Sequence, residues 1–433
     1  MLKFGTTSVP LALTRPCQQI LPNPVPGERR TEEEVILGAL RSPYGQPPLR
    51  QRDLSGKRVC VVISDITRSW QRTDVYLPYI LEELKAAGAQ ERDITLLCAL
   101  GTHRKHTEAE KIALVGEDIY RRYRFVDHDC DDGANLTSIG RTSRGVEVEI
   151  SRWAAQADFL LLCGAIVFHD MAGFGGGRKS IVPGIAGRRT IMGNHALSMN
   201  PLGAGIHPDA RQNNRLTNPL SLDMEEAADL AAPDFLFNVI VDDGRITDAF
   251  AGDLREAFDA GCETLRGRFL VPIPRLFDGV IASAGGYPCD INFYQSVKAL
   301  ANACFASRPG GTIVLLCAAP EGLGNPDMAG LYGESRDLAH MERLLRADFS
   351  IGRFISFLAA ADAKRFRVIC VMDGSWFSGG ENEADRKLLE KFGVEVTESL
   401  PQALALAAFP ADAALCLMPD ASKTLPWTEA ARG

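Results

Sequence analysis

The sequence predicts an α/β protein in which largely parallel sheets are covered by helices. Apolar runs of strand length alternate with amphipathic segments of helix length, which is typical of βα units. Polar and glycine-rich turns follow several of the apolar runs, where ligands bind in open α/β sheets. The chain has 433 residues, whereas a typical domain has about 100–200, so we expect two domains.

The expected elements follow one another along the chain. Residues 59–64 are an apolar strand, and 75–87 are a helix with one apolar face that ends at Gly88. Further strands are expected at the apolar runs 94–100, 159–167, 279–283, 312–317, 368–372 and 413–418.

A domain boundary is expected between residues 268 and 275, where Pro272 and Pro274 precede a new strand-helix-strand series. The first domain then covers residues 1–270 and the second covers 275–407. The opening forty residues are rich in proline and predict an irregular or short-stranded arm.

The composition indicates a globular protein that binds small molecules. Hydrophobic residues make up 46% and charged residues 24% of the chain, which excludes a disordered or collagen-like chain. The net charge of −8 comes without a basic block, which argues against nucleic acid or an anionic membrane as a partner. The 11 scattered cysteines form no C-x-x-C pair, and neither an export signal nor a run of about 20 apolar residues is visible. We therefore expect a cytoplasmic protein.

Two loops after expected strands carry polar groups that suit ligand binding. Residues Asp65 to Arg68 combine an acceptor, a hydroxyl and a guanidinium, which suits the sugar and phosphate of a nucleotide. A helix cap by Asp65 and a surface ion pair of Arg68 would explain the same residues. His103 follows the next strand, although a lone loop histidine is often structural.

The richest segment follows the expected strand 159–167. It joins His169 to Lys179 through a glycine-rich loop, and Asn194 and His195 come shortly afterwards. Glycines let the backbone approach a ligand and offer N–H groups to phosphate. Arg178 stands where the P-loop and the dinucleotide fingerprint both require glycine, so the segment is neither motif. The flanking histidines and lysine nevertheless indicate a functional site.

A fourth loop follows the expected strand 279–283 and leads into a helix. Asp290 is placed to cap that helix, and Gln295 and Lys298 are three residues apart, hence on one face. An amide beside an ammonium suits a carboxylate ligand. A solvated helix face would show the same pattern.

On these motifs the sequence resembles the lactate racemase family, which uses a nickel-pincer nucleotide, from about Gly5 to the C-terminus. One motif runs from His169 through Ala172-Gly173-Phe174 and Gly176-Gly177-Arg178-Lys179 to Pro183-Gly184-Ile185-Ala186-Gly187 and Asn194-His195. The other comprises Gly286-Tyr287-Pro288, Asp290-Ile291-Asn292 and Tyr294-Gln295-Ser296-Val297-Lys298. The resemblance implies two α/β domains that enclose a cleft, with the C-terminal segment 408–433 returning to the first domain.

The resemblance also implies residue roles. The cofactor, Ni(II)-pyridinium-3,5-bisthiocarboxylate mononucleotide, would be attached covalently to Lys179, and His195 would be the one protein ligand of nickel. One imidazole is enough because two sulfurs and a ring carbon of the cofactor fill the other positions of a square-planar ion. The other implied roles are nucleotide binding by Asp65, Ile66, Thr67 and Arg68, acid/base catalysis by His103 and His169, and substrate binding by Gln295 and Lys298. Proteins that make the cofactor are then expected partners.

The implied reaction is the racemisation or C2 epimerisation of a 2-hydroxy acid. Inversion through a planar 2-oxo intermediate requires transfer of the C2 hydride to the cofactor and loss of the hydroxyl proton. One histidine would then be the base for one enantiomer and the other histidine for its mirror image. The sequence departs from the usual family pattern at Ser69, after Arg68, and at Gly175. Trp70 could narrow the pocket, and Arg72 could meet a second carboxylate.

Two other functions remain open. An NAD(P)-dependent 2-hydroxy acid oxidoreductase fits the α/β pattern but lacks the dinucleotide fingerprint. A non-catalytic carrier of the nickel nucleotide would need Lys179 and His195 but not the two acid/base histidines or the substrate-binding pair. All of these residues are present, which favours catalysis.

Overall fold

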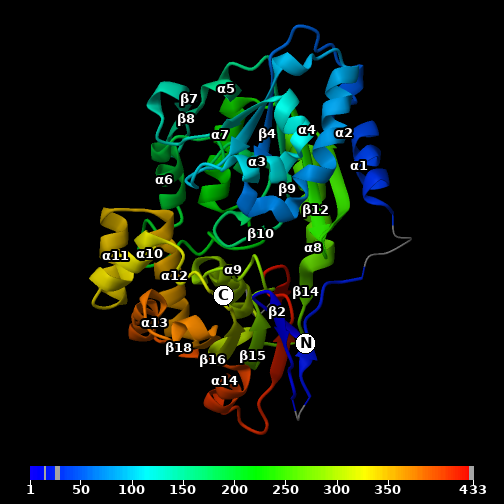
Figure 1. The fold of residues 1–433 in the computed structure, drawn as a ribbon. Helices are drawn as coiled ribbons and strands as arrows, with labels where there is room; N and C mark the ends of the chain where they lie inside the picture. The colour runs from blue at the N-terminus through cyan, green and yellow to red at the C-terminus, as the bar shows by residue number, and fades with distance from the viewer. Residues whose placement is uncertain (14–15, 25–29, 429–433) are drawn as a thin grey trace. The chain divides into compact units, whose positions relative to one another are not determined.

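The computed structural model describes residues 1–13, 16–24 and 30–428, and the chain folds into two compact α/β units (Figure 1). The first unit comprises Pro26–Ser198 and Asp209–Arg266. The second unit comprises Met1–Val25, Met199–Pro208 and Gly267–Gly433. Each has a largely parallel six-stranded sheet, which confirms the expected fold class.

The first unit is built on a sheet with the strand order β13-β12-β9-β4-β5-β6, in which only β12 and β13 pair antiparallel. Its strands are β4 (Val59–Ser64), β5 (Ile94–Ala99), β6 (Arg124–Asp127), β9 (Phe159–Ala165), β12 (Phe235–Asp242) and β13 (Arg245–Gly252). All of β9 is buried, as expected for a central parallel strand that is covered on both faces.

The helices of the first unit cover this sheet. They are α1 (Glu32–Arg41), α2 (Thr73–Ala86), α3 (Glu108–Val115), α4 (Glu117–Arg122), α5 (Arg152–Ala155), α6 (Arg188–Ala196), α7 (Pro219–Ala231) and α8 (Leu254–Phe269). Alternate strand residues form one hydrophobic core with α1 to α4. Two hairpins complete the unit, β7 (Leu136–Arg141) with β8 (Glu147–Ser151) and β10 (Phe168–His169) with β11 (Gly173–Phe174).

The second unit has an all-parallel sheet with the order β18-β17-β16-β15-β19-β3. Its strands are β3 (Gln18–Gln19), β15 (Phe277–Ser283), β16 (Ser307–Leu316), β17 (Arg367–Val371), β18 (Val394–Thr397) and β19 (Leu415–Met418). Its helices are α9 (Phe293–Cys304), α10 (Pro326–Glu334), α11 (Leu338–Ala347), α12 (Ile351–Arg365), α13 (Glu381–Lys391) and α14 (Leu400–Ala407). The hairpin of β1 (Leu2–Phe4) with β2 (Thr7–Val9) and the pair β14 (Leu270–Pro272) with β20 (Leu425–Trp427) complete it.

Three expected domain assignments are wrong. Residues 199–208 were expected in the first domain but belong to the second unit. The C-terminal segment 408–433 does not return to the first domain, because β19 pairs with β15 in the second unit. Residues 1–25 do not belong to the first domain either, since β3 pairs with the other edge of β19. β19 therefore lies between β15 and β3 inside the sheet of the second unit, and all four of its side chains are buried. Residues 429–433 lie outside the described residues.

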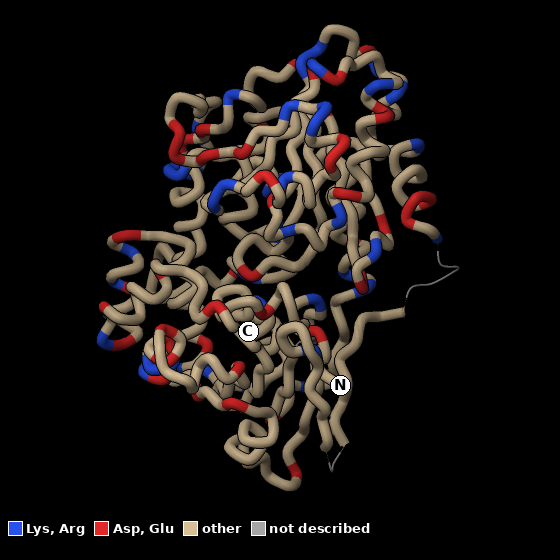
Figure 2. The backbone as a smooth tube through the Cα atoms, viewed as in Figure 1, with Lys and Arg blue, Asp and Glu red and all other residues tan. Residues whose placement is uncertain are grey.

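Charged residues of both signs are interspersed along both units (Figure 2). This distribution agrees with the absence of a basic block in the sequence. Within the described part of the chain, no helix combines the length and the apolarity that a membrane span requires.

Candidate active site

The order in which the chain adds strands to the sheet of the first unit reverses at β4, and the expected site residues follow the strands at this point. From β4 the chain builds β5 and then β6 on one side, and later β9 and then β12 on the other. In open α/β sheets, ligands bind at the carboxyl ends of the two strands between which the order reverses in this way, which here are β4 and β9. Asp65 follows β4, and the segment that contains His169 follows β9.

The turn after β4 is organised by the side chain of Asp65. This buried carboxylate caps the 3-10 turn Ile66–Gln71, because Oδ1 accepts hydrogen bonds from Thr67 N at 2.7 Å and Thr67 Oγ1 at 2.5 Å. Burial alone would raise the pKa of Asp65, but His103, Arg68 and Thr67 together hold it well below its ordinary value. The carboxylate therefore stays charged.

His103 is oriented by that carboxylate. His103 Nδ1 lies 2.9 Å from Asp65 Oδ2, and the charged acceptor places the ring proton on Nδ1. The loop itself is held at Gly101, whose φ is +55° and whose N–H donates to Gly184 O at 2.9 Å. The side chain of His103 is 36% exposed, so Nε2 is left as the proton acceptor of a half-buried imidazole.

His169 is oriented by its own turn. It lies on β10 opposite Gly173, and its Nδ1 is 3.2 Å from Met171 N and 3.3 Å from Ala172 N. Asp170 Oδ1 is 2.9 Å from the same nitrogen. Met171 N and Ala172 N donate to Nδ1, so the proton of the neutral ring lies on Nε2, and the contact with Asp170 gains strength when Nδ1 is also protonated.

The glycine-rich loop presses directly against the sheet. Gly177 N donates to Asn238 Oδ1 on β12 at 2.7 Å, and Asn238 is fully buried. Gly176 has a φ of +82°, and a Cβ on it would lie 2.7 Å from both Ala165 O and Asn238 Oδ1. Only glycine fits there, and Lys179 follows in the 3-10 turn Gly177–Ser180.

Arg178 anchors the loop from the other side. Its buried guanidinium donates to Ser221 Oγ on α7 at 2.6 Å and to Ala172 O at 3.2 Å, and it lies 4.8 Å from the ring centre of Phe258 on α8. Burial lowers the pKa of Arg178 to about 10, so the group remains charged at neutral pH.

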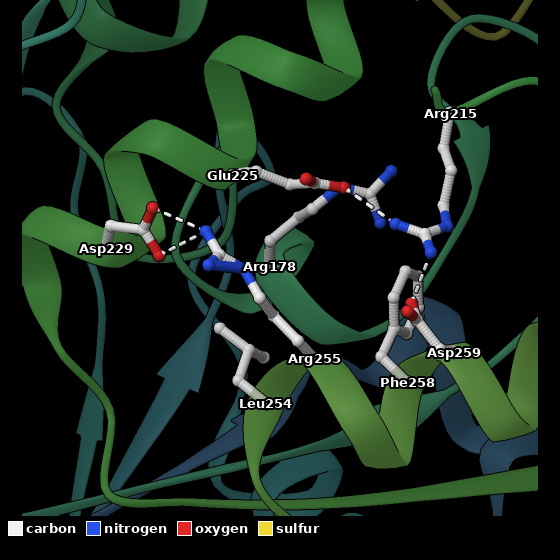
Figure 3. Close-up of a pocket in the computed structure, with 8 residues that line it drawn as sticks. All are labelled: Arg178, Arg215, Glu225, Asp229, Leu254, Arg255, Phe258 and Asp259. Carbon is white, nitrogen blue, oxygen red and sulfur yellow. Dashed lines mark hydrogen bonds and ion pairs between the residues drawn. The ribbon is translucent and has the colours of Figure 1, made fainter.

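The cavity beside Arg178 is shown in Figure 3. Its volume is about 20 Å³, which is room for one water molecule. Ion pairs of Arg215 with Glu225 and of Arg255 with Asp229 line it. The cavity is therefore too small for a hydroxy acid, and Arg178 is a structural anchor of the loop.

His195 on α6 has the protonation state that a metal ligand requires. It is 2% exposed, and its Nδ1 donates to Ile191 O at 2.9 Å, which leaves the lone pair on Nε2. Burial, followed by the positive charge of Lys179, lowers the pKa of His195 to about 3. A neutral imidazole beside an amino group fits a nickel-bearing group that is tethered through that amino group.

A second group of potential metal ligands lies behind the turn after β4. One ligand atom each of Cys98, His106 and Asp127 lies within 4.8 Å of the others. His106 and Asp127 are hydrogen bonded to each other, with Nδ1 2.7 Å from Oδ1. Neither residue was expected to have a role.

In the second unit, the expected substrate pair lies together on α9. Lys298 Nζ donates to Gln295 Oε1 at 2.7 Å, as the spacing predicts. The expected cap is wrong: Asn292, not Asp290, caps α9, because its Oδ1 accepts from Gln295 N at 3.0 Å. Asp290 is two residues too early, and its Oδ2 instead accepts from Gly5 N at 2.7 Å and from Ala318 N at 3.2 Å.

Arg72 and Trp70, which the sequence suggested for the substrate pocket, contact other parts of the first unit. Arg72 lies 3.4 Å from Glu32 Oε1 and also donates to Gly244 O, so it is tied to α1 and the β12–β13 turn. Trp70 packs against the core that α1 to α4 form on the sheet. Asn238 was missed, although it interrupts the apolar run of β12.

Comparisons with known proteins cover nearly the whole chain. Residues 4–205 match the family described as the lactate racemase N-terminal domain, and residues 275–422 match the lactate racemase C-terminal domain. Lactate racemase from Lactiplantibacillus plantarum is 32% identical over 376 residues, which are 86% of this chain and 85% of that protein. Lactate racemase from Thermoanaerobacterium thermosaccharolyticum is 35% identical over 308 residues, which are 71% and 70% of the two chains.

Solved structures show the same similarity. The lactate racemase apoprotein from Thermoanaerobacterium thermosaccharolyticum superimposes with a TM-score of 0.87 at 30% identity and covers 99% of both chains. A protein from Thermotoga maritima has a TM-score of 0.69 at 16% identity, with 93% of this chain and 99% of that one covered, and shows the same fold.

Proposed function

The chain belongs to the lactate racemase family and is a racemase, and we propose that it interconverts the two configurations at C2 of a 2-hydroxy acid. The observation that supports this most directly is the pair His103 and His169. Their loops follow β5 and β9, the two strands that flank β4, and Nδ1 of each ring is held by neighbouring groups. We therefore assign proton transfer to Nε2 of each ring, with Nε2 an acceptor in neutral His103 and an N–H donor in neutral His169.

Two oriented imidazoles suit a reaction that must treat mirror-image substrates alike. The hydroxyl proton of one enantiomer passes to Nε2 of one histidine, and the other histidine returns a proton to the opposite enantiomer. Asp65 keeps the proton of His103 on Nδ1 and stabilises the charge that forms when Nε2 takes a second proton.

We propose that Lys179 holds a nickel-pincer nucleotide covalently and that His195 Nε2 binds its nickel. When bound, that group supplies an acceptor for the C2 hydride, which no protein side chain can provide. The low pKa of His195 is consistent with this assignment, because a ligand must keep its lone pair at neutral pH. Asp65, Ile66, Thr67 and Arg68 are proposed to hold the nucleotide part. The proteins that make the cofactor are then required partners.

Gln295 and Lys298 are proposed to bind the carboxylate of the substrate. Their 2.7 Å hydrogen bond holds the ammonium and the amide side by side, so that both can point donors at one anion. Lactate is the first candidate substrate, because the two named relatives are lactate racemases. Lys298→Met should raise KM for the hydroxy acid far more than it lowers kcat.

The decisive experiment gives cofactor-loaded protein a panel of single enantiomers of 2-hydroxy acids in heavy water and separates the products by chiral chromatography. We expect the opposite configuration at C2 for at least one acid. Lactate, a longer aliphatic acid, an aromatic acid and a sugar acid cover the open choice of side chain. Accumulation of a 2-oxo acid with added NAD(P) would instead indicate an oxidoreductase. A nickel adduct that inverts no acid would indicate a carrier.

A further inference from the structure

A second histidine of the loop after β5 lies behind the expected nucleotide-binding turn. His106 is buried, with 1% of its side chain exposed, and its Nδ1 lies 2.7 Å from Asp127 Oδ1 at the end of β6. The backbone N–H of His106 also donates to Asp127 Oδ2 at 3.1 Å. Lys111 Nζ on α3 lies 3.2 Å from the same oxygen. Asp127 therefore holds both the ring and the backbone of His106.

The other ring nitrogen of His106 reaches the turn after β4. His106 Nε2 accepts a hydrogen bond from Ile66 N at 2.9 Å. Burial alone would raise the pKa of Asp127, but His106 and Lys111 outweigh this and lower it. The charged carboxylate accepts a hydrogen bond from Nδ1–H, so Nε2 carries a lone pair, which is what the N–H of Ile66 requires.

We propose that His106 is a positioning residue that sets the conformation of the turn Asp65 to Arg68. Besides the hydrogen bonds within the turn, two hydrogen bonds connect the turn to the loop after β5. Asp65 Oδ2 accepts a hydrogen bond from His103 Nδ1, and Ile66 N donates one to His106 Nε2. One loop thus supplies both histidines, and a shift of His106 moves the carboxylate that orients His103. The part of this inference that concerns nucleotide binding rests on the proposed function.

A metal ion at Cys98, His106 and Asp127 fits the observed contacts less well. Both ring nitrogens of His106 already have partners, and Asp127 is paired with Lys111. Burial raises the pKa of the Cys98 thiol well above its ordinary value, whereas metal binding requires the thiolate. An ion bound to Nε2 would have to displace the N–H of Ile66, which would then lose its acceptor.

Two amide variants separate the two hydrogen bonds of the ring. The amide of asparagine occupies the place of Nδ1, so His106→Asn retains a donor to Asp127 but offers Ile66 no acceptor. The longer glutamine reaches the place of Nε2, so His106→Gln retains the acceptor for Ile66. Comparable melting temperatures of the two variants would show that any difference between them is local to the turn.

The first readout is hydrogen–deuterium exchange of the apoprotein, followed by mass spectrometry of peptides that cover residues 65–71. We expect exchange to be roughly 5- to 100-fold faster in His106→Asn than in the wild type, because the N–H of Ile66 loses its acceptor. Exchange in His106→Gln should be near normal. Equal exchange in both variants would overturn the proposal. So would a stoichiometric zinc or nickel ion in the untagged apoprotein that disappears in both His106→Asn and Asp127→Asn.

The second readout is binding of nicotinic acid mononucleotide to the apoprotein by calorimetry. His106→Asn should bind this probe at least about fivefold more weakly than the wild type, and His106→Gln should bind it as the wild type does. If the wild type does not bind the probe, the nucleotide assignment of the proposed function fails, while the exchange experiment still decides the role of His106. Equal affinity in all three proteins would reject positioning of the nucleotide by His106.

Discussion

Asp65 Oδ2 and His103 Nδ1 are 2.9 Å apart, so one carboxylate connects the expected nucleotide turn with an expected acid/base group. Asp65 follows β4 and His103 follows β5, and the parallel pairing of these strands brings the two loops together. The proton position on His103 is therefore set by a residue of the neighbouring loop. Correct orientation of the imidazole depends on the same turn that we propose to hold the nucleotide.

The two histidines are expected to have opposite enantiomer preferences. In His103→Ala and in His169→Ala, overall racemisation should fall by roughly 10²–10⁴-fold, because each turnover needs one imidazole to accept and the other to donate a proton. Each variant should still reduce the cofactor with the enantiomer that its remaining histidine serves. Stopped-flow absorbance with each pure enantiomer measures this half-reaction. The same preference in both variants, or near-normal racemisation in either, would disprove the assignment.

Covalent attachment and nickel retention are expected to depend on different residues. Lys179→Ala should lose the mass of the nucleotide adduct, because only its amino group forms the bond. His195→Ala should keep the adduct but lose nickel on dialysis. Intact-protein mass spectrometry and metal analysis of the same samples distinguish these outcomes. Lys57→Ala, an exposed lysine of the same unit, is the matched control. An unchanged adduct in Lys179→Ala would reject the tether.

Two neighbouring glycines of the loop should differ sharply in their tolerance of a methyl group. Gly176→Ala should lower the free energy of unfolding by roughly 2–4 kcal/mol, because its Cβ would meet backbone and a buried amide at 2.7 Å and its φ is positive. Gly175→Ala should cost about 1 kcal/mol or less, since the closest contact of its Cβ is the methyl group Cγ2 of Val167 at 3.0 Å, and the next is Val167 O at 3.8 Å. Chemical denaturation measures both. Equal destabilisation would show that the loop does not press on β9 as described.

The pH dependence of stability should contain a contribution from Asp362 on α12. Burial raises the pKa of this carboxyl to about 6, compared with about 3.9 in the unfolded chain. The folded state therefore binds the proton more tightly, so the stability that this group contributes is complete below about pH 4 and is lost as the pH rises through about 6.

The corresponding variant is Asp362→Asn, which removes this titration. It should be more stable than the wild type by about 1–3 kcal/mol at pH 8 and should differ little at pH 4. Urea denaturation at the two pH values measures the difference. The exposed Asp412→Asn provides the same chemical change without burial. A gain of equal size at both pH values would rule out titration of Asp362 as its cause.

Much of the fold could be predicted because buried parallel strands are continuous apolar runs. β4 has the expected bounds, and the other expected strands differ from the observed ones by a few residues at one or both ends. A short-stranded arm was expected here, but the place of β3 could not be predicted, since it has two residues and is defined by the pairing of Gln18 and Gln19 with β19. Such a pairing depends on the whole fold and leaves no local pattern.

The residues expected at the site lie in contiguous motifs, whereas contacts with a partner that is distant in sequence were missed. Spacing alone predicted that Gln295 and Lys298 share a face of α9, because the helix repeat is local. The role of Asp290 depends on Gly5, and the contact of His106 depends on the backbone N–H of Ile66. A backbone donor has no signature in the sequence, so neither contact could be predicted from residue types.

The three-segment composition of the second unit limits how the protein can be divided for expression. A fragment that starts at Gly267 would lack β3, and β19 would become an exposed edge that invites aggregation. It would also leave Asp290 Oδ2 without the N–H of Gly5, and Ser283 Oγ without Lys3 O, to which it donates at 2.6 Å. An isolated second unit would therefore need circular permutation, with residues 1–24 joined after β20, to fold with its edges paired.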